Sequence, residues 1–441
     1  MKLIFSTAIL FLLLSNHSLF SQSFWQNVSP KNVHNHFQSG TFYSQEQGYV
    51  VGWAYAEGGS VSSTIARTAD GGKSWLTEDF PDIELNSISF RDEKNGIVVG
   101  RSLDCNCPII LSTTDGGEDW SESKVSDLQG GFNAVDFADQ MNGVIGGGDP
   151  DAARGYLLRT VDGGKTFTKV MDEGGRYISR LDLVTSKLLF IVTGEFAGVE
   201  KSIFRSQNVD ADSAQVAFTE VKDFGETSLI NSINFVNELY GITVLTFFDE
   251  ETFEFRADIF RTVDGGENWN QFFTTPDFTL ITADFLDADH GVAVGSDGTI
   301  VMTDDGGASW KDTTTFATSL LTWCEYASPT TIYAAGTSGT VMKYQSSLVS
   351  VTTGPDVVKG RFVEVIGSVG GGAVLIVVDE GRDHLIGSTL EVVNVRGSLV
   401  AEETISAPRV GIEFRDFTPG LYFYRLVHKG SLLGSGHFMV R

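Results

Sequence analysis

The sequence RTADGGKSW, residues 67–75, recurs with small changes at four later positions. The copies are STTDGGEDW (112–120), RTVDGGKTF (159–167), RTVDGGENW (261–269) and MTDDGGASW (302–310). Their aspartates, Asp70, Asp115, Asp162, Asp264 and Asp305, are separated by 45, 47, 102 and 41 residues. The interval of 102 residues spans two repeats, because IFRSQNVDADSAQVAF (203–218) keeps the incoming strand there without the glycines. A period of 40 to 50 residues therefore organises this chain, and we call the repeated motif the DGG box.

A second recurring phrase precedes each DGG box and predicts two further strands. It consists of an alternating strand, a polar turn and a small apolar strand. Its clearest copies are NSISFRDEKNGIVVG (86–100), NAVDFADQMNGVIGG (133–147), NSINFVNELYGITVL (231–245) and ITADFLDADHGVAVG (281–295). More divergent copies are SGTFYSQEQGYVVG (39–52), ISRLDLVTSKLLFIV (178–192) and LTWCEYASPTTIYAAG (321–336). Seven such units, each of four short strands, predict an all-β fold with a seven-bladed β-propeller over residues 23–348.

The two ends of this expected ring are also visible in the sequence. The seventh unit stops at GTVMKYQSS (339–347) without a fourth strand, whereas SFWQNVSP (23–30) reads as a fourth strand without a unit of its own. We therefore expect the N-terminal strand to complete the last blade, which removes a free sheet edge.

Each residue of the DGG box has a mechanical role in a hairpin turn. The aspartate accepts hydrogen bonds from turn amides, the glycine adopts a positive φ, and the final aromatic packs back over the hairpin. A calcium loop needs more spaced oxygen ligands and a phosphate loop needs a lysine and a helix, so we expect no metal and no cofactor at the boxes. The residues with this structural role are Asp70, Gly72, Trp75, Asp115, Gly117, Trp120, Asp162, Gly164, Phe167, Asp264, Gly266, Trp269, Asp305, Gly307 and Trp310.

The boxes resemble the bacterial neuraminidase repeat (BNR), or Asp-box. The whole unit resembles propellers of the photosystem II assembly factor family, which are related to sortilin-like and xyloglucanase-like propellers. The resemblance covers about residues 37–346 and implies the fold. It implies little about activity, because propellers with this repeat include hydrolases, receptors and assembly factors.

The N-terminus predicts export. Lys2 precedes the apolar run LIFSTAILFLLL (3–14), which is too short to span a bilayer, and small and polar residues follow. We expect residues 1–22 to be a cleaved signal peptide. Export permits disulfides, so Cys105 and Cys107 are expected to form a local disulfide. The alternative is a metal site, which the absence of a nearby histidine or second cysteine pair disfavours. Cys324 is expected to be a small buried hydrophobe.

The composition limits the partners. The chain has 57 acidic and 31 basic side chains and a formal net charge of −26, which repels the phosphates of nucleic acids. No segment after the N-terminal run has eighteen uninterrupted apolar residues. We expect a mature chain that is monomeric, has no membrane span and does not bind nucleic acid.

A different β pattern begins at about residue 360. About seven strands in roughly 80 residues predict a small immunoglobulin-like β-sandwich over residues 360–441. The segments LEVVNVRGSLVAEE (390–403) and FRDFTPGLYFYRLVHKGSLLGSGHFMV (414–440) resemble the C-terminal sorting domain of the type IX secretion system of the Bacteroidetes. Leu421 and Tyr422 after Gly420 match the Gly-x-Tyr strand start of that domain.

The resemblance of the tail implies a route and a location. The secretion machinery would recognise the tail, and the protein would pass through the periplasm to the cell surface or the medium. The alternative is an ordinary accessory sandwich.

Ligands of propellers usually bind on the face opposite the boxes, where loops join the second and third strands. These loops are long in the first five units, and we call this side the long-loop face. Its aromatic residues are candidates for stacking on a sugar or anchoring a protein: Trp53, Tyr55, Phe247, Phe248, Phe253 and Phe255. Alternatively, the phenylalanines pair across an extended hairpin.

No catalytic constellation emerges from the sequence. Carboxylates on the long-loop face that are candidates for an acid and base pair include Asp149, Asp151, Glu195 and Asp249. The arginines before the boxes stand at one repeat position in separate units, so we expect structural roles for Arg67, Arg159, Arg205 and Arg261. The leading hypothesis is a secreted or surface-displayed protein- or glycan-binding module, and the alternative is a glycan-cleaving hydrolase.

Overall fold

The computed structural model describes residues 24–55, 58–149, 151–174, 176–194, 200–211, 213–225, 228–249, 254–275, 279–313, 319–345, 358–359, 363–366, 373–378, 388–394, 399–405, 409–414, 420–428 and 431–440. The expected signal peptide, residues 1–22, lies outside these ranges. The described chain is built from strands, which confirms the all-β expectation. It divides into two compact units, Met1–Leu348 (unit 1) and Val349–Arg441 (unit 2).

Unit 1 contains seven four-stranded antiparallel sheets, which we number in chain order. Sheet 1 is β2 (His36–Phe42), β3 (Gly48–Tyr55), β4 (Val61–Thr68) and β5 (Leu76–Pro81), and sheet 2 is β6 (Ile83–Phe90), β7 (Gly96–Ser102), β8 (Cys107–Thr113) and β9 (Ser121–Lys124). Sheet 3 is β10 (Gly131–Phe137), β11 (Gly143–Asp149), β12 (Arg154–Thr160) and β13 (Thr168–Gly174), and sheet 4 is β14 (Tyr177–Leu183), β15 (Leu189–Gly194), β16 (Glu200–Ser206) and β17 (Thr219–Asp223). Sheet 5 is β18 (Ser228–Phe235), β19 (Gly241–Asp249), β20 (Glu254–Thr262) and β21 (Asn270–Thr275), and sheet 6 is β22 (Leu280–Phe285), β23 (Gly291–Gly295), β24 (Ile300–Thr303) and β25 (Lys311–Asp312).

Sheet 7 is assembled from both ends of unit 1. It contains β26 (Leu321–Ser328), β27 (Thr331–Gly336), β28 (Val341–Gln345) and β1 (Phe24–Asn27). Strand β1 pairs antiparallel with β28, from Phe24 opposite Gln345 to Asn27 opposite Met342. The Val341 amide donates to Ser29 Oγ at 2.8 Å just beyond the paired residues. The beginning of unit 1 therefore supplies an edge strand to its last sheet.

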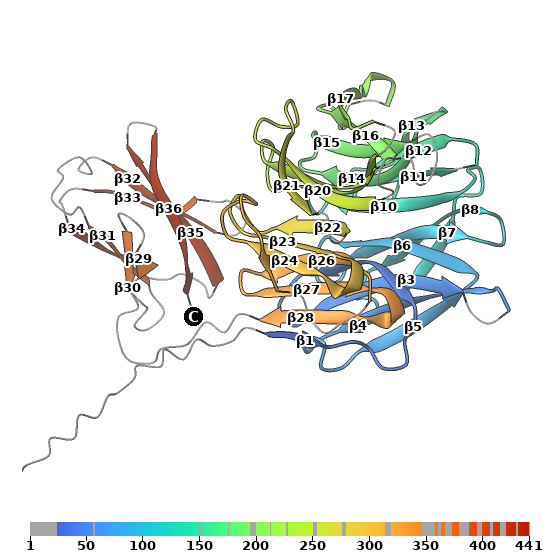
Figure 1. The fold of residues 1–441 in the computed structure, drawn as a ribbon, viewed down its shortest axis with the longest axis horizontal. Coiled ribbons are helices and arrows are strands. Elements are labelled where there is room, and N and C mark those ends of the chain that lie inside the picture. The colour runs from blue at the N-terminus through green and yellow to red at the C-terminus, as the bar shows by residue number, and fades with distance from the viewer. Residues whose placement is uncertain are drawn as a thin grey trace, which may run out of the picture. The chain divides into compact units, whose positions relative to one another are not determined.

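The seven sheets follow one another in a closed circuit (Figure 1). The first strand of each sheet contacts the first strand of the next, and β26 of sheet 7 contacts β2 of sheet 1. Each of seven hydrophobic clusters lies between consecutive sheets. The cluster between sheets 7 and 1 contains Phe37, Phe42 and Tyr333. Four-stranded sheets stacked in this way have the arrangement of a β-propeller.

The burial of a strand follows its position in the sheet. In β7, Ile97 and Val99 belong to the cluster with sheet 3, whereas Val98 belongs to the cluster with sheet 1. Such middle strands are apolar throughout because both faces of the sheet are covered. The outer strands β5 and β9 are almost fully exposed, and β9 is the polar sequence SESK. Charged outer strands protect the free edge of each sheet from pairing with other chains.

A phenylalanine–glycine pair recurs where the first strand turns into the second. Phe42 lies opposite Gly48, and the same pairing joins Phe90 to Gly96. A Cβ atom on Gly48 would lie 2.3 Å from the Phe42 ring. Without that atom the ring crosses the second strand and stacks on Tyr333 of the preceding sheet, with 3.6 Å between ring centroids. The glycine in the second recurring phrase therefore makes room for contacts between sheets.

Unit 2 contains two four-stranded sheets. One is β29 (Val358–Lys359), β30 (Val363–Ile366), β31 (Ala373–Val378) and β34 (Arg409–Phe414), and the other is β32 (Thr389–Asn394), β33 (Leu399–Thr404), β35 (Gly420–His428) and β36 (Ser431–Val440). The described residues of unit 2 thus contain eight strands, one more than the approximately seven that the sequence predicted. Val392 lies opposite Tyr424, and both are buried on one face of their sheet.

The described helices are three short 3-10 turns, η1 (Ser213–Gln215), η2 (Ser296–Gly298) and η3 (Thr337–Gly339). Within the described residues, no helix is long and apolar enough to cross a membrane.

Candidate binding face

The DGG box is a turn closed by its own side chains. Asp70 accepts the Ser74 amide at 2.8 Å through Oδ1 and the Ser74 hydroxyl at 2.6 Å through Oδ2. Thr68 Oγ1 accepts the Gly72 amide at 2.8 Å, and both glycines have positive φ, 72° for Gly71 and 84° for Gly72. The other four boxes repeat the aspartate and threonine contacts.

The hydrogen bonds of the box determine how its carboxylate titrates. The Ser74 hydroxyl and amide hold the pKa of Asp70 below its usual range, and equivalent contacts lower the pKa of Asp162 to about 2. In the part of the chain that the structure describes, no three His, Cys, Asp or Glu side chains gather as a metal site requires. The carboxylate oxygens of Asp70 and Asp162 accept hydrogen bonds from amides and hydroxyls of their own turns.

An arginine stands before three of the five boxes and before the corresponding turn of sheet 4, and it connects neighbouring sheets. Arg205 of sheet 4 donates to the Gly265 carbonyl in the box of sheet 5 at 2.7 Å, and Arg261 donates to Gly306 of sheet 6 at 2.8 Å. Arg67 makes the same contact with Gly116 at 3.0 Å. Where sheet 2 has Ser112 at this position, Arg91 donates to Gly163 instead. A glycine carbonyl of the box thus accepts a hydrogen bond from an arginine of the preceding sheet. The sequence predicted only the contacts within the turn.

Two aromatic residues, the partly buried Trp53 and the exposed Tyr55, lie against each other on the long-loop face of sheet 1. Tyr55 is 69% exposed, and its ring lies edge-on to Trp53 with 5.6 Å between centroids. Trp53 Nε1 donates to Asn86 Oδ1 at 3.1 Å, and Asn86 Nδ2 donates to the Phe132 carbonyl at 2.9 Å. Trp53 is therefore held in place by Asn86 of sheet 2, which is itself bound to sheet 3, and the exposed Tyr55 ring rests against Trp53.

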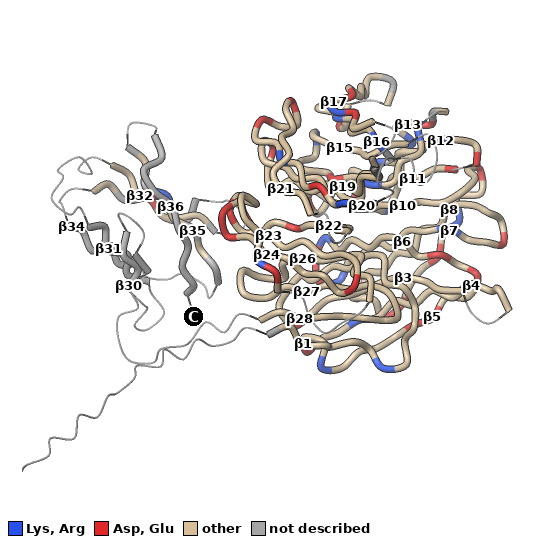
Figure 2. The backbone as a smooth tube through the Cα atoms, in the orientation of Figure 1, with Lys and Arg blue, Asp and Glu red and all other residues tan. Residues whose placement is uncertain are grey.

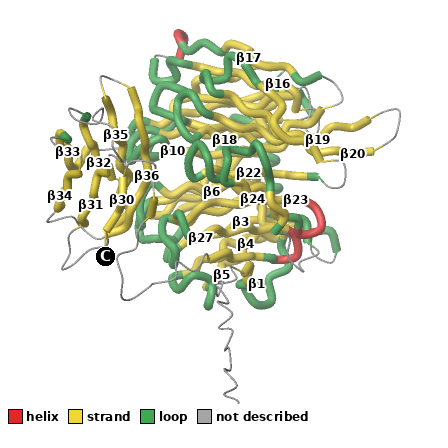
Figure 3. Tube along the Cα trace, turned by 60° about the vertical axis from the view of Figure 1, so that its left-hand side comes forward, coloured by secondary structure: helices red, strands yellow, loops and turns green. Residues whose placement is uncertain are grey.

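Three of the other predicted aromatics, Phe247, Phe248 and Phe255, lie on strands β19 and β20 of sheet 5, which project beyond their neighbours in Figure 3. Phe248 lies opposite Phe255, with 5.0 Å between ring centroids. The Arg256 guanidinium lies 4.3 Å from the centre of the Phe247 ring. Phe253 lies outside the described residues. Phe248 and Phe255 thus pair across their own strands, whereas Phe247 lies opposite Arg256, and all three belong to a different sheet from Trp53 and Tyr55.

The described candidate carboxylates are also divided between sheets. Asp149 ends β11 of sheet 3 opposite Arg154, and it accepts the Asp151 amide at 3.1 Å. Asp249 ends β19 of sheet 5 opposite Glu254. Glu195 lies outside the described residues. The described contacts do not bring these carboxylates together as an acid and base pair.

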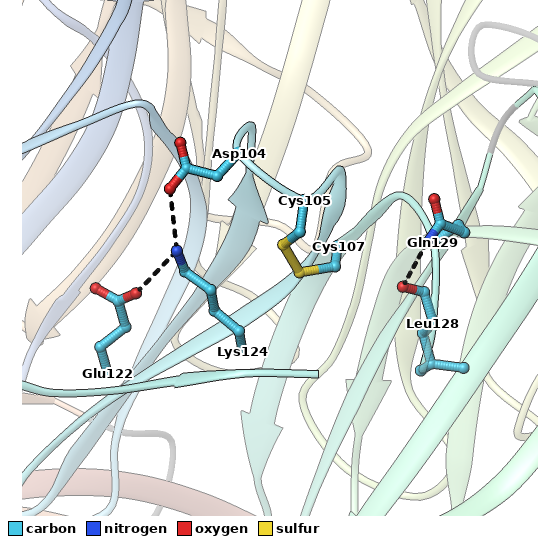
Figure 4. The surroundings of a disulfide bond; sticks show 7 residues. All are labelled: Asp104, Cys105, Cys107, Glu122, Lys124, Leu128 and Gln129. Carbon is cyan, nitrogen blue, oxygen red and sulfur yellow. Dashed lines mark hydrogen bonds and ion pairs between the residues drawn. A yellow bond between two sulfur atoms is a disulfide. The ribbon is translucent and has the colours of Figure 1, made fainter. Parts of the chain in front are cut away.

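Figure 4 shows Cys105 and Cys107 joined as a disulfide in the turn between β7 and β8, with Lys124 and Asp104 beside it. The same turn is held by backbone hydrogen bonds from the Leu103 amide to Asp82 and from the Gly130 amide to Asn106, at 2.9 and 3.0 Å. Of the two alternatives for the cysteine pair, the structure has the disulfide. Cys324 is free and buried between sheets 6 and 7.

A groove of about 250 Å³ lies between sheets 1 and 2 on the box side. It is lined by Ile65, Arg67, Leu76, Thr77, Glu78, Gly117, Glu118 and Trp120. Burial raises the pKa of Glu78, and nearby Asp119 adds to this effect. No sequence pattern pointed to this groove, because its lining comes from two units about fifty residues apart. The chain has 57 acidic and 31 basic side chains, and Figure 2 shows both kinds spread over the strands and loops of unit 1.

The closed series of four-stranded sheets and the five boxes define a β-propeller of the DGG-box type. A family model described as "Photosynthesis system II assembly factor YCF48" matches residues 17–131. The solved structure "YCF48 bound to D1 peptide" aligns with a TM-score of 0.56 at 18% identity, over 73% of this chain and 97% of that chain. YCF48 from Cyanidioschyzon merolae aligns with a TM-score of 0.55 at 16% identity, over 74% and 99%.

A GH74 xyloglucanase from Xanthomonas campestris aligns with a TM-score of 0.45 at 10% identity, over 93% of this chain and 87% of that chain. A search of the curated proteins gives no match. The two YCF48 alignments confirm the propeller fold expected from the repeats. Their low identities carry no assignment of function.

Proposed function

We propose that unit 1 is a closed seven-bladed propeller that binds a segment of another protein through its long-loop face. The seven sheets and the contact of β26 with β2 support the blade number. The observation that carries the binding role is the Trp53–Tyr55 pair: the Tyr55 ring is exposed, and it lies against a partly buried Trp53 that Asn86 holds in place. Exposed aromatic side chains that are already ordered lose little entropy on binding, and such residues dominate protein interfaces.

A protein ligand is favoured over a glycan by one comparison. A structural neighbour of the same fold is described as bound to a peptide. A flat stacking surface alone also suits a sugar ring, so the test must separate the two ligand classes.

The test compares two single substitutions on opposite faces of the propeller. Tyr55→Ala removes the exposed ring, and Val161→Ala removes an apolar side chain of similar exposure from the box of sheet 3. Immobilised wild-type chain is incubated with outer-membrane extract of the producing cell and, separately, with a glycan array. We expect a protein to be retained by wild type and Val161→Ala, with retention at least tenfold weaker for Tyr55→Ala. Equal retention by all three, or retention of glycans alone, would contradict the proposal.

We further propose that the chain is exported to the cell surface or the medium and that unit 2 is the sorting signal. The N-terminal apolar run and the resemblance of residues 390–440 to a type IX sorting domain support this route. Removing residues 349–441 should leave the propeller in the periplasm while a chain that keeps unit 2 reaches the surface. Surface delivery of the shortened chain at the level of the full chain would show that unit 2 is an accessory domain.

A further inference from the structure

We propose that four carboxyl groups near the axis of unit 1 bind protons in the folded protein and thereby make the closure of its ring of sheets depend on pH. The four residues are Asp136, Asp182, Asp284 and Glu325, at equivalent positions of the first strands of sheets 3, 4, 6 and 7. We call them the axial carboxyls. Each stands immediately before the residue that ends the regular pairing of first and second strands.

Each axial carboxyl joins its sheet to the next one. The Leu183 amide donates to Asp136 Oδ2 at 2.8 Å, the Phe235 amide to Asp182 Oδ2 at 2.5 Å, the Tyr326 amide to Asp284 Oδ2 at 2.7 Å, and the Phe42 amide to Glu325 Oε2 at 3.3 Å. The last of these contacts crosses from sheet 7 to sheet 1, where the circuit closes. The axial carboxyls therefore act at four of the junctions between sheets.

The charged neighbours of these groups are mainly other carboxylates. Burial raises the pKa of Asp182 well above its usual range, and the charges of Asp136 and Asp284 raise it further. Burial and the same two carboxylates also raise the pKa of Glu325. The remaining titratable groups beside Asp284 are the Cys324 thiol and the Tyr326 phenol, which burial keeps neutral. Backbone amides oppose these effects but do not cancel them, and the pKa of each axial carboxyl is raised above its usual range.

The direction of the pH effect follows from linkage. In the unfolded chain the same groups ionise near pH 4. Because their pKa values are higher in the folded protein, the folded state holds more protons as the pH rises above about 4. The associated stability is complete below pH 4 and is lost as the pH rises through the folded-state pKa values. The ring is therefore held most tightly in mild acid and loosens toward alkaline pH.

The chain itself provides the model for a neutral replacement. Asn234 occupies the equivalent position in sheet 5, and its Nδ2 donates to Asp284 Oδ1 at 3.3 Å. An asparagine at position 182 keeps an oxygen that can accept the Phe235 amide, and it removes the negative charge. Because Asn234 Oδ1 has no hydrogen-bond partner among the described residues, an asparagine at this position can also lose the contact between sheets. The test therefore reads the pH dependence of melting, which loss of a neutral contact does not change, and not the melting temperature at one pH.

The experiment measures thermal unfolding of the full chain from pH 5 to pH 9, with Asp182→Asn and the exposed-site control Asp127→Asn. We expect the melting temperature of wild type and the control to fall by more than about 5 °C over this range, and the fall to be at least halved in Asp182→Asn. Urea unfolding of wild type in weakly buffered solution at pH 7 should also release protons, and the variant should release fewer. Identical pH profiles for the two variants, or no proton release from wild type, would overturn the proposal.

A bound cation is the competing way to neutralise the axial carboxyls. Millimolar Ca²⁺ and an excess of chelator are therefore compared at pH 8. Unchanged melting in both supports protons as the neutralising species. A large rise with Ca²⁺ that is lost in Asp182→Asn would assign the ring to a metal and overturn the proton account.

Discussion

At the scale of single residues, the recurring side chains of unit 1 act between sheets as well as within turns. Arg205 reaches the box of the next sheet, Phe42 stacks on the preceding sheet, and Asp182 accepts an amide from the next first strand. Each of these contacts joins residues from neighbouring repeats. The repeated residues therefore form the same kind of contact between neighbouring sheets at several places in unit 1.

Gly96→Ala tests the phenylalanine–glycine pair. A Cβ atom at Gly96 would lie 2.4 Å from the Phe90 ring, so the ring or the strand must move. We expect a loss of about 1–3 kcal/mol in the free energy of unfolding, the usual cost of overpacking. Gly174→Ala is the control, because a Cβ atom there meets no other atom within 4 Å. Equal stability of the two variants in urea would contradict this role for the glycine.

Arg205→Ala tests the contact between a box and the preceding sheet. The substitution leaves the Gly265 carbonyl without its charged donor, and we expect a cost of about 1–3 kcal/mol in urea unfolding. Arg154→Ala removes a more exposed ion pair with Asp172 within sheet 3, and water screens this pair, so it should cost clearly less than Arg205→Ala. A larger loss of unfolding free energy in Arg154→Ala than in Arg205→Ala would contradict the view that contacts between sheets contribute more to stability than ion pairs within a sheet.

At the scale of elements, the box turn has a pH dependence opposite to that of the axial carboxyls. The pKa of Asp162 is lowered to about 2 by Thr166, so its contribution is present above about pH 4 and is lost as the pH falls toward 2. Asp162→Asn should therefore reduce the loss of stability between pH 4 and pH 2, relative to Asp127→Asn. Parallel acid-unfolding curves for the two variants would contradict the role of Thr166 as a charge-stabilising donor.

The disulfide is a second element-scale device, and we expect it to matter little for folding. It closes a loop of three residues, whose entropy accounts for only about 1–2 kcal/mol, and backbone hydrogen bonds already hold the turn. Reduction of the intact chain should lower the melting temperature by less than about 5 °C. A larger fall would mean that the turn between β7 and β8 depends on the disulfide.

Features within one repeat could be predicted from the sequence, whereas contacts between repeats could not. The repeat period, the four strands of a unit and the glycine conformations follow from patterns within about fifty residues, and the sequence reveals them. The carbonyl that accepts from Arg205 and the amide that donates to Asp182 lie one repeat further along, so the pattern shows that these residues recur but not what they contact. For the site, the pairing of Phe248 with Phe255 was one of two expected alternatives, whereas the Asn86 contact of Trp53 depends on a neighbouring sheet.

At the scale of the whole molecule, closure of the circuit depends on the strand contributed by the N-terminus. Without β1, the edge of β28 would be exposed, and the Ser29 contact with Val341 would be lost. Deleting residues 24–30 should lower the melting temperature of the chain by several degrees and promote association through the free edge. Light scattering and thermal unfolding would measure both, and a monomeric chain of unchanged stability would contradict this role of β1.

The account assigns the boxes to structure and the opposite face to binding. Hydrogen exchange of the full chain, with and without the protein captured by the wild-type chain, tests this division directly. We predict slower exchange at Trp53–Tyr55 and in the neighbouring strand Val61–Thr68, with unchanged exchange in the box turn of residues 160–167. Protection confined to the box turns would place binding on the wrong face of the propeller for this account.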